Sequence, residues 1–598
     1  MTSGDKTGPT YSTPTWWKEA IIYQIYPSSF QSHPGAKTGW GSIKGITSRL
    51  DYIKSLGANI VWSSPFFKSP QADMGYDIAD YKDVDPCYGT LDDVDTLISE
   101  LRKRGMKLVV DLVVNHTSNE HPWFLESRSS KDNPKRNWYH WREPSRVVDG
   151  KPEPPNNWAQ ILGEANSAWT YDEVTGEYYL TLFTPEQPDL NWENPEVRHA
   201  VWDVMHFWLK RGASGFRLDV INLISKVPEY PEADIVLDPK DNKYQPAFRY
   251  FVNGPKLHDY LHEMHTEVLS KYDAITVGEM PGVSDENEIL RTVGAQAEEL
   301  RMIFIFDLVD IDKRDVRMAL KPWDLKEMKS VVTRWQRTMI EKNGWNSVFI
   351  ENHDNPRSVS RYTDDSDEYR HLGAKLLALM QTTLGGTLFV YQGEELGIRN
   401  LPKEWDIDQE YKDIETVNYW KKVKKMYGND PEQLQHGRAV VHMKARDHAR
   451  SPMQWNASAN AGFCDPDVKP WMRVSDDYKS INAEAQMKAD DSNEDSVWQF
   501  WQHCIRRRKE HSDAFVYGDF EEVKAEHPNV YSYLRTGSTG EKWLVVLNFF
   551  SRQVEWYLPD KLKVEKWVCG NYTKGEVAKP RTGRVPLKPW EGLLAKCS

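Results

Sequence analysis

The sequence predicts an α/β protein built on a (β/α)8 TIM barrel, with a subdomain inserted after the third strand and an antiparallel β-domain at the C-terminus. Three observations predict this architecture. Eight short apolar segments alternate with amphipathic segments between residues 16 and 391, which is typical of a closed parallel barrel. This alternation fails over residues 117–190. After about residue 518, strand-like runs separated by turn residues replace it.

The eight apolar segments have the length and the boundaries of β-strands. They lie at residues 21–26, 59–62, 107–114, 215–219, 274–278, 302–306, 347–350 and 386–391. Residues 107–114 are apolar on both faces, as expected for a parallel strand that helices cover. Since each strand is linked to the next through a helix, the count favours a closed barrel over an open sheet.

Amphipathic segments between the strands predict the helices of the barrel. The first spans residues 42–56, where Ile43, Ile46, Leu50 and Ile53 recur at helical spacing. Other helices are predicted at residues 91–104, 196–211, 256–271, 323–343 and 368–384. Residues 394–515 contain only helical and loop pieces with charged segments.

The composition changes along the chain and predicts the domain boundaries. A stretch rich in Ser, Thr, Gly and Pro predicts a loose N-terminal arm, and a stretch rich in Pro, Asn, Trp and charge predicts the inserted subdomain. At the C-terminal end, residues 530–534 and 543–547 read as strands joined by a turn at 537–540. The predicted division is an arm at 1–15, a barrel at 16–116 and 191–517, an inserted subdomain at 117–190 and a C-terminal β-domain at 518–598.

Composition and charge exclude several classes of function. The chain of 598 residues has a formal net charge of −13, which argues against a nucleic-acid binder. Five scattered cysteines without metal-ligand spacing indicate free thiols in a reducing compartment, so we expect a cytoplasmic protein. Its first residues are polar, and no uncharged run reads as a membrane span. We therefore expect a monomer that acts on a small molecule, without a membrane, nucleic acid or cofactor partner.

Acidic residues and histidines follow four of the predicted strands. They are Asn115-His116, Asp219, Glu279 and the run Glu351-Asn352-His353-Asp354. Since a barrel carries its chemistry at the C-terminal ends of its strands, we expect these side chains to converge on one rim. Side chains alternate along a strand, so Arg217 points the same way as Asp219 and favours its ionised form.

Paired carboxylates on such a rim suit glycoside hydrolysis. One carboxylate attacks or stabilises the sugar carbon, and a second, protonated one gives its proton to the leaving oxygen. Two alternatives remain open from the residues alone. Acids at this rim also bind divalent metals in other barrels, and a strand-end acid can simply form a salt bridge or cap a loop.

Four motifs resemble those of the α-amylase family (glycoside hydrolase family 13). They are Asp111-Leu112-Val113-Val114-Asn115-His116, Gly215-Phe216-Arg217-Leu218-Asp219, Gly278-Glu279 and Asn352-His353-Asp354. The resemblance implies that Asp219 is the nucleophile and Glu279 the general acid/base. It implies that Asp354 grips the 2- and 3-hydroxyl groups of the sugar. Glu279 should then be protonated near neutral pH, in an apolar site or close to a like charge.

The same resemblance implies the residues that bind substrate. Arg217, His116 and His353 resemble residues that hold the nucleophile and the reacting sugar. Asp73 and Tyr76 match the pair around the terminal glucose, and Arg450 matches the arginine that closes this pocket. An Asp–Arg clamp of this kind blocks further sugars and implies exo-action on short substrates.

Two further features narrow the expected substrate. Residues 187–191, with the sequence Gln-Pro-Asp-Leu-Asn, resemble the motif of the oligo-1,6-glucosidase subfamily. In this subfamily a valine directly after the nucleophile, here Val220, goes with α-1,6 linkages, although Val220 is also compatible with plain strand packing. The resemblance therefore implies a retaining, exo-acting α-glucosidase that hydrolyses isomaltose and short isomalto-oligosaccharides.

Alternatives from other classes remain. The enzyme could prefer α-1,4 links or sucrose, or transfer or isomerise sugars, although the signature of sucrose isomerases is absent from residues 355–361. Transporter heavy chains share the fold, but they lack the full set of catalytic carboxylates and carry a membrane span. Residues 31–41, where many bacterial relatives bind calcium, hold no carboxylate and one lysine, so we expect no metal there.

Overall fold

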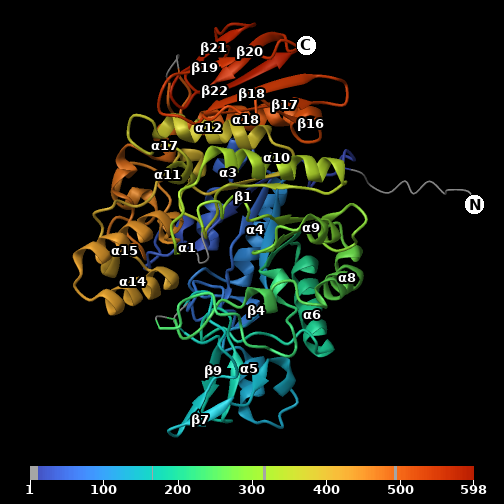
Figure 1. Cartoon of the computed structure of the whole chain (residues 1–598), viewed down its shortest axis with the longest axis vertical. Coiled ribbons are helices and arrows are strands. Elements are labelled where there is room, and N and C mark those ends of the chain that lie inside the picture. The colour runs from blue at the N-terminus through green and yellow to red at the C-terminus, as the bar shows by residue number, and fades with distance from the viewer. Residues whose placement is uncertain (1–10, 164–165, 241, 314–317, 491–493) are drawn as a thin grey trace, which may run out of the picture.

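Eight parallel strands form a nearly closed barrel at the centre of the protein (Figure 1). The computed structural model describes residues 11–163, 166–240, 242–313, 318–490 and 494–598. The hydroxyl of Ser347 donates to the carbonyl oxygen of Ile303 at 2.7 Å, which joins the two end strands of the sheet. The predicted fold class is thus confirmed. In chain order the strands are β1 (Ile21–Ile25), β2 (Ile60–Ser63), β5 (Lys107–Val113), β11 (Gly215–Asp219), β12 (Ile275–Glu279), β13 (Met302–Phe304), β14 (Ser347–Val348) and β15 (Thr387–Tyr391).

Helices with one apolar face cover the barrel. In α4 (Leu91–Lys103), Val94, Leu97, Ile98 and Leu101 are buried, and Thr90 with Asp93 forms a capping box at its start. The other predicted barrel helices are also present, as α6 (Pro195–Arg211), α8 (Leu257–Glu267), α10 (Leu325–Glu341) and α12 (Arg370–Thr383).

The prediction of one helix over residues 42–56 was wrong. The structure has two helices there, α2 (Ile43–Ser48) and α3 (Leu50–Leu56), which meet at Arg49. Within α2, the hydroxyl groups of Thr47 and Ser48 donate to backbone carbonyls of the preceding turn. Such bonds compete with the helical backbone pattern and are a local reason for the break.

Of the N-terminal arm predicted at residues 1–15, the structure describes residues 11–15, and Tyr11 among them is packed. Residues 1–10 lie outside the described residues. Tyr11 is buried, and its ring centroid lies 4.9 Å from that of Trp345. Its backbone N–H donates to the side chain of Asn343. The packing of Tyr11 against Trp345 therefore holds this end of the arm in place, although the residues around it are polar.

The inserted region contains α5 (Pro122–Ser129) and a three-stranded antiparallel sheet of β6 (Trp141–Arg142), β10 (Glu177–Leu180) and β9 (Trp169–Asp172). A hairpin of β7 (Arg146–Val148) and β8 (Lys151–Glu153) extends from it. Figure 1 shows this region at the end of the molecule opposite the C-terminal sheet. An apolar cluster joins it to the chain just after β11, and this cluster includes Trp158, Leu180, Leu182, Val220 and Leu223. The inserted region thereby reaches the C-terminal ends of the barrel strands.

The C-terminal region is an antiparallel β-structure, as its strand pattern predicts. Its five-stranded sheet has the order β16 (Asp519–Val523), β17 (Val530–Thr536), β18 (Lys542–Asn548), β22 (Gly592–Cys597) and β20 (Val564–Gly570). A second pair comprises β19 (Val554–Tyr557) and β21 (Arg584–Leu587). The sheet lies against α12 and α18 (Val497–Glu510), away from the inserted region (Figure 1).

A helical hairpin flanks the barrel between β15 and the C-terminal sheet. It comprises α14 (Ile414–Tyr427) and α15 (Pro431–Lys444), and Asp413 and Asp430 cap the two N-termini. A short helix, α16 (Asp447–Arg450), follows and returns the chain to the barrel rim. Within the described residues, every helix is too short or too polar to cross a bilayer.

Candidate active site

A cavity of about 280 Å³ opens at the C-terminal ends of the barrel strands. Seven of the ten predicted site residues line it, namely Asp73, Tyr76, His116, Asp219, Val220, Glu279 and Asp354. The other three, Arg217, His353 and Arg450, are buried behind its wall and contact residues that line it. The predicted strand ends therefore do converge on one rim.

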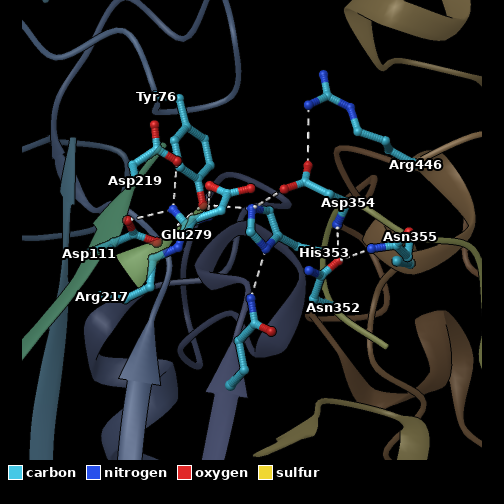
Figure 2. Close-up of polar contacts among 12 residues, drawn as sticks. Tyr76, Asp111, Arg217, Asp219, Glu279, Asn352, His353, Asp354, Asn355 and Arg446 are labelled. Carbon is cyan, nitrogen blue, oxygen red and sulfur yellow. Dashed lines mark hydrogen bonds and ion pairs between the residues drawn. The ribbon is translucent and has the colours of Figure 1, made fainter. Parts of the chain in front are cut away.

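Arg217 joins three carboxylates at the floor of the site (Figure 2). Its Nη1 donates to Asp111 at 2.8 Å and to Asp219 at 2.6 Å, and its Nη2 donates to Glu279 at 2.5 Å. The residues belong to three adjacent strands, β5, β11 and β12, which pair in parallel register. Because one guanidinium group contacts both Asp219 and Glu279, the two proposed catalytic carboxyl groups are held close together.

This crowding of acids affects their protonation. Burial raises the pKa of Asp219 well above its usual value; Arg217 opposes this shift, while Glu279 and Asp111 add to it. Burial likewise raises the pKa of Asp111 to about 6. The expectation that Arg217 keeps Asp219 ionised stays a prediction, because Arg217 acts against burial and two neighbouring acids.

Val220 follows the nucleophile candidate in an unusual backbone conformation. Its φ of 35° and ψ of 44° lie in the left-handed region, which a β-branched residue rarely adopts. Its backbone N–H donates to Glu279 at 3.2 Å. The turn thus ties the end of β11 to the end of β12 and exposes the Val220 side chain to the cavity.

A chain of hydrogen bonds orients His353 from the opposite side (Figure 2). The amide of Gln24, at the end of β1, contacts His353 Nδ1 at 2.7 Å. His353 Nε2 lies 2.6 Å from the Tyr76 hydroxyl and 3.0 Å from Asp354. Burial lowers the pKa of His353 to about 4, so the ring is neutral at neutral pH. Because the Gln24 amide donates to Nδ1, the ring proton lies on Nε2, which faces Asp354.

Asp354 contacts two arginines through one of its carboxylate oxygens. Its Oδ1 accepts from Arg450 at 2.9 Å and from Arg446 at 3.2 Å. Burial raises the pKa of Asp354, but His353 and the two arginines outweigh this effect and hold it well below its usual value. Asp354 is therefore ionised over the whole neutral range.

Arg446 lines the cavity, whereas Arg450, which we expected to close the pocket, is buried behind it. Arg446 lines the cavity and contacts Asp73 at 3.3 Å, whereas Arg450 lies behind it and donates to Asp354 and Asp413. The two arginines are four residues apart in Arg446-Asp447-His448-Ala449-Arg450. The sequence shows that both face one way, but only the packing of α16 determines which one reaches Asp73.

Residues 187–190 of the inserted region support the pocket from behind its wall. Gln187 donates to Asp73 at 3.2 Å and lies 3.2 Å from His116 Nε2. Asp189 accepts from Asn115 at 2.8 Å and pairs with Lys226 at 3.1 Å. The motif thus connects the inserted region to the ends of β5 and β11.

Comparison with protein families identifies the chain. The family described as "Alpha amylase, catalytic domain" matches residues 24–518. The chain belongs to the α-amylase family.

Relatives over the full length place it within this family. An α-glucosidase of Schizosaccharomyces pombe is 46% identical over 98% of both chains. An oligo-1,6-glucosidase of Parageobacillus thermoglucosidasius is 46% identical over 97% of this chain and 99% of its own. Among solved structures, a mutant isomaltulose synthase of Erwinia rhapontici NX5 in complex with sucrose has 37% identity and a TM-score of 0.89, covering 98% of this chain and 100% of that chain. The protein is a glycoside hydrolase of the α-glucosidase and oligo-1,6-glucosidase type.

Three residues of this α-amylase-family site were not predicted as site residues. Asp111 lies inside the first quoted motif, so its position was available from the sequence. Gln24 is a polar residue near the end of β1, after three apolar or aromatic ones, which resembles the signal that marks the other rim residues. Arg446 has no such signal, because it lies outside the barrel strands.

The expectation that residues 31–41 bind no metal stays a prediction. Within the part of the chain that the structure describes, no cluster of three or more His, Cys, Asp or Glu side chains has metal-binding geometry. In the loop itself, the backbone N–H of Gly35 donates to Asp465 at 2.9 Å. The carboxylate that contacts this loop therefore belongs to Asp465, which lies far along the chain.

Proposed function

We propose that this protein is a retaining, exo-acting α-glucosidase that hydrolyses the terminal α-1,6 link of isomaltose and short isomalto-oligosaccharides. The observation that carries the proposal is the contact of Arg446 with both Asp73 and Asp354. This bridge closes one end of the cavity beside Asp354. A cavity closed at that end accepts a single terminal glucose. The rest of the bound substrate then extends past Glu279.

The proposed first step forms a covalent glycosyl-enzyme. The carboxylate of Asp219 attacks the anomeric carbon, and the bond from this carbon to the glycosidic oxygen breaks. Glu279 gives its proton to the leaving oxygen. Arg217, which donates to both carboxylates, stabilises the charge that this transfer leaves on Glu279.

The proposed second step restores the enzyme. A water molecule attacks the anomeric carbon from the side that the leaving group vacated, and Glu279 accepts its proton. The bond to Asp219 breaks, and glucose leaves with its original α configuration. Asp354 stays ionised throughout, because His353 and two arginines hold its pKa low. It can therefore accept hydrogen bonds from sugar hydroxyls in both steps.

The linkage preference rests on Val220. Its side chain lines the cavity on the Glu279 side and is held in place by the strained turn. A rigid, branched apolar group there narrows the space for the leaving sugar and favours the more flexible α-1,6 link. A change of one methyl or hydroxyl group in a pocket alters selectivity by about 10–200-fold.

The test is to compare initial rates on isomaltose, maltose and sucrose with the wild-type protein and with Val220→Thr. Threonine has nearly the same shape as valine, so it serves as a matched probe of chemistry at this position. We expect wild type to prefer isomaltose, and Val220→Thr to raise the maltose-to-isomaltose rate ratio by about 10-fold or more. A wild-type preference for maltose would contradict the proposed linkage, and isomerised products from sucrose would favour the activity of the isomaltulose synthase relative. Asp219→Asn, which removes the nucleophile, should abolish turnover of all three sugars.

A further inference from the structure

Asp413 lies behind the closed end of the cavity and contacts both arginines of this region. Its Oδ2 accepts from Arg446 at 2.7 Å and from Arg450 at 2.8 Å. Both arginines also contact one oxygen of Asp354, at 3.2 Å and 2.9 Å. Asp413 is 2% exposed, so water screens these contacts little. Asp413 and Asp354 thus each contact both arginines, and Arg446 also contacts Asp73 at 3.3 Å and Glu415 at 3.7 Å.

The two arginines need a shared anion to lie side by side. Arg446 precedes α16 and Arg450 is its last residue, so their guanidinium groups lie one helical turn apart on the same face. Both are buried, and the positive charge of Arg446 opposes that of Arg450. Asp354 offsets this repulsion from the cavity side and Asp413 from the opposite side.

The backbone fixes Asp413 itself. Its Oδ1 accepts from the N–H groups of Glu415 at 3.1 Å and Thr416 at 3.4 Å, which caps α14. Its own N–H donates to Asp447 at 2.9 Å. One oxygen therefore anchors the residue to a helix, and the other holds the arginines.

We propose that Asp413 is a positioning residue, whose carboxylate holds Arg446 and Arg450 together against Asp354 and so orients Asp354 toward the 2- and 3-hydroxyl groups of the bound glucose. This inference rests on the proposed function, because the role of Asp354 toward those hydroxyls belongs to it. Asp413 does not line the cavity and acts through the two arginines.

The chain offers a matched control for testing this role. Asp430 caps α15 as Asp413 caps α14, with its Oδ1 accepting from the N–H groups of Glu432 and Gln433. It is exposed. Asparagine is as good a helix cap as aspartate. Asp413→Asn and Asp430→Asn therefore both keep a cap, and Asp413→Asn alone takes the charge away from the arginines.

The experiment measures kcat/KM for p-nitrophenyl α-glucoside and for its 2-deoxy analogue, which lacks one hydroxyl that Asp354 is proposed to bind. We expect Asp413→Asn to lower kcat/KM for the glucoside by about 10–100-fold and for the analogue by less than about threefold. Asp430→Asn should change neither value by more than about threefold. Asp413→Glu, which keeps the charge, should recover most of the glucoside activity.

The ratio of the two kcat/KM values decides the result, because it does not depend on the fraction of folded enzyme. An equal loss on both substrates would contradict the proposal, since a purely structural role affects both alike. An Asp413→Glu variant with the same ratio as Asp413→Asn would overturn it too, because the restored charge would then have no effect. A wild-type enzyme that cleaves both substrates equally would instead contradict the role of Asp354, and with it the proposed function.

Discussion

Arg217 shows how a single residue determines the charge of the site. Strand alternation places it beside Asp219, and this neighbour is predictable from the sequence. The contacts with Asp111 and Glu279 come from two adjacent strands, so they depend on the sheet register and are not visible in the hexapeptide. These additional acids raise the pKa of Asp219 further, whereas Arg217 lowers it.

Asp73 gives a prediction for the dependence of substrate binding on pH. Burial raises its pKa to about 6, although Arg446 and Arg450 oppose the shift. Above this value the carboxylate is ionised and pairs with Arg446; as pH falls through 6 it is protonated and the pair is lost. Asp73→Asn, which mimics the protonated form, should raise the KM for isomaltose by about tenfold at pH 8 and change it little at pH 5. A ratio of mutant to wild-type KM that stays constant from pH 5 to pH 8 would rule out this role.

The secondary-structure elements explain which parts of the site the sequence could predict. Rim residues at the ends of β5, β11 and β12 were predicted because apolar runs mark these strands and polar residues follow them. Residues held by irregular elements were harder. The break between α2 and α3 depends on side-chain bonds within one turn, and the choice between Arg446 and Arg450 depends on how α16 packs. Local pattern carries no information on either.

Lys226 joins the inserted region to the barrel through a buried ion pair with Asp189. It is buried, and its Nζ contacts Asn115 at 3.0 Å, the Leu223 carbonyl at 2.8 Å and Asp189 at 3.1 Å. Lys226→Met leaves Asp189 buried without its cation, which should cost about 3–5 kcal/mol of stability and lower the melting temperature. The exposed Lys210 is the matched control, and Lys210→Met should cost less than about 1 kcal/mol.

Adding Asp189→Asn to Lys226→Met should recover part of the loss, because it removes the unpaired charge. Melting temperatures of the single and double variants check this coupling. Equal melting temperatures for Lys226→Met and Lys210→Met would show that the buried lysine contributes nothing at this junction.

At the scale of the whole molecule, three regions assemble one cavity. The barrel supplies the carboxylates and the inserted region supplies Gln187, which holds Asp73. The segment with α14 and α16 supplies Arg446, which lines the cavity, and Asp413 and Arg450 behind it. The C-terminal sheet lies at the opposite end and contributes no residue to the lining. The barrel and both added regions were predicted, whereas the closure by α14 and α16 came only from the structure.

Stability in the presence of a chelator tests the prediction about residues 31–41. With no carboxylate of its own in this loop, the protein should not need calcium for folding. We therefore expect the melting temperature to be the same with and without EDTA. A decrease of several degrees that added calcium reverses would contradict the prediction.

The most direct test of the proposed mechanism is the configuration of the first glucose released from isomaltose, followed by NMR before mutarotation. The mechanism uses two displacements at the anomeric carbon, first by Asp219 and then by water, and each inverts the configuration. It therefore predicts that the glucose cleaved from the non-reducing end is released as the α anomer and converts to the β anomer only later. Initial release of β-glucose would show a single displacement and contradict the role of Asp219 as the nucleophile.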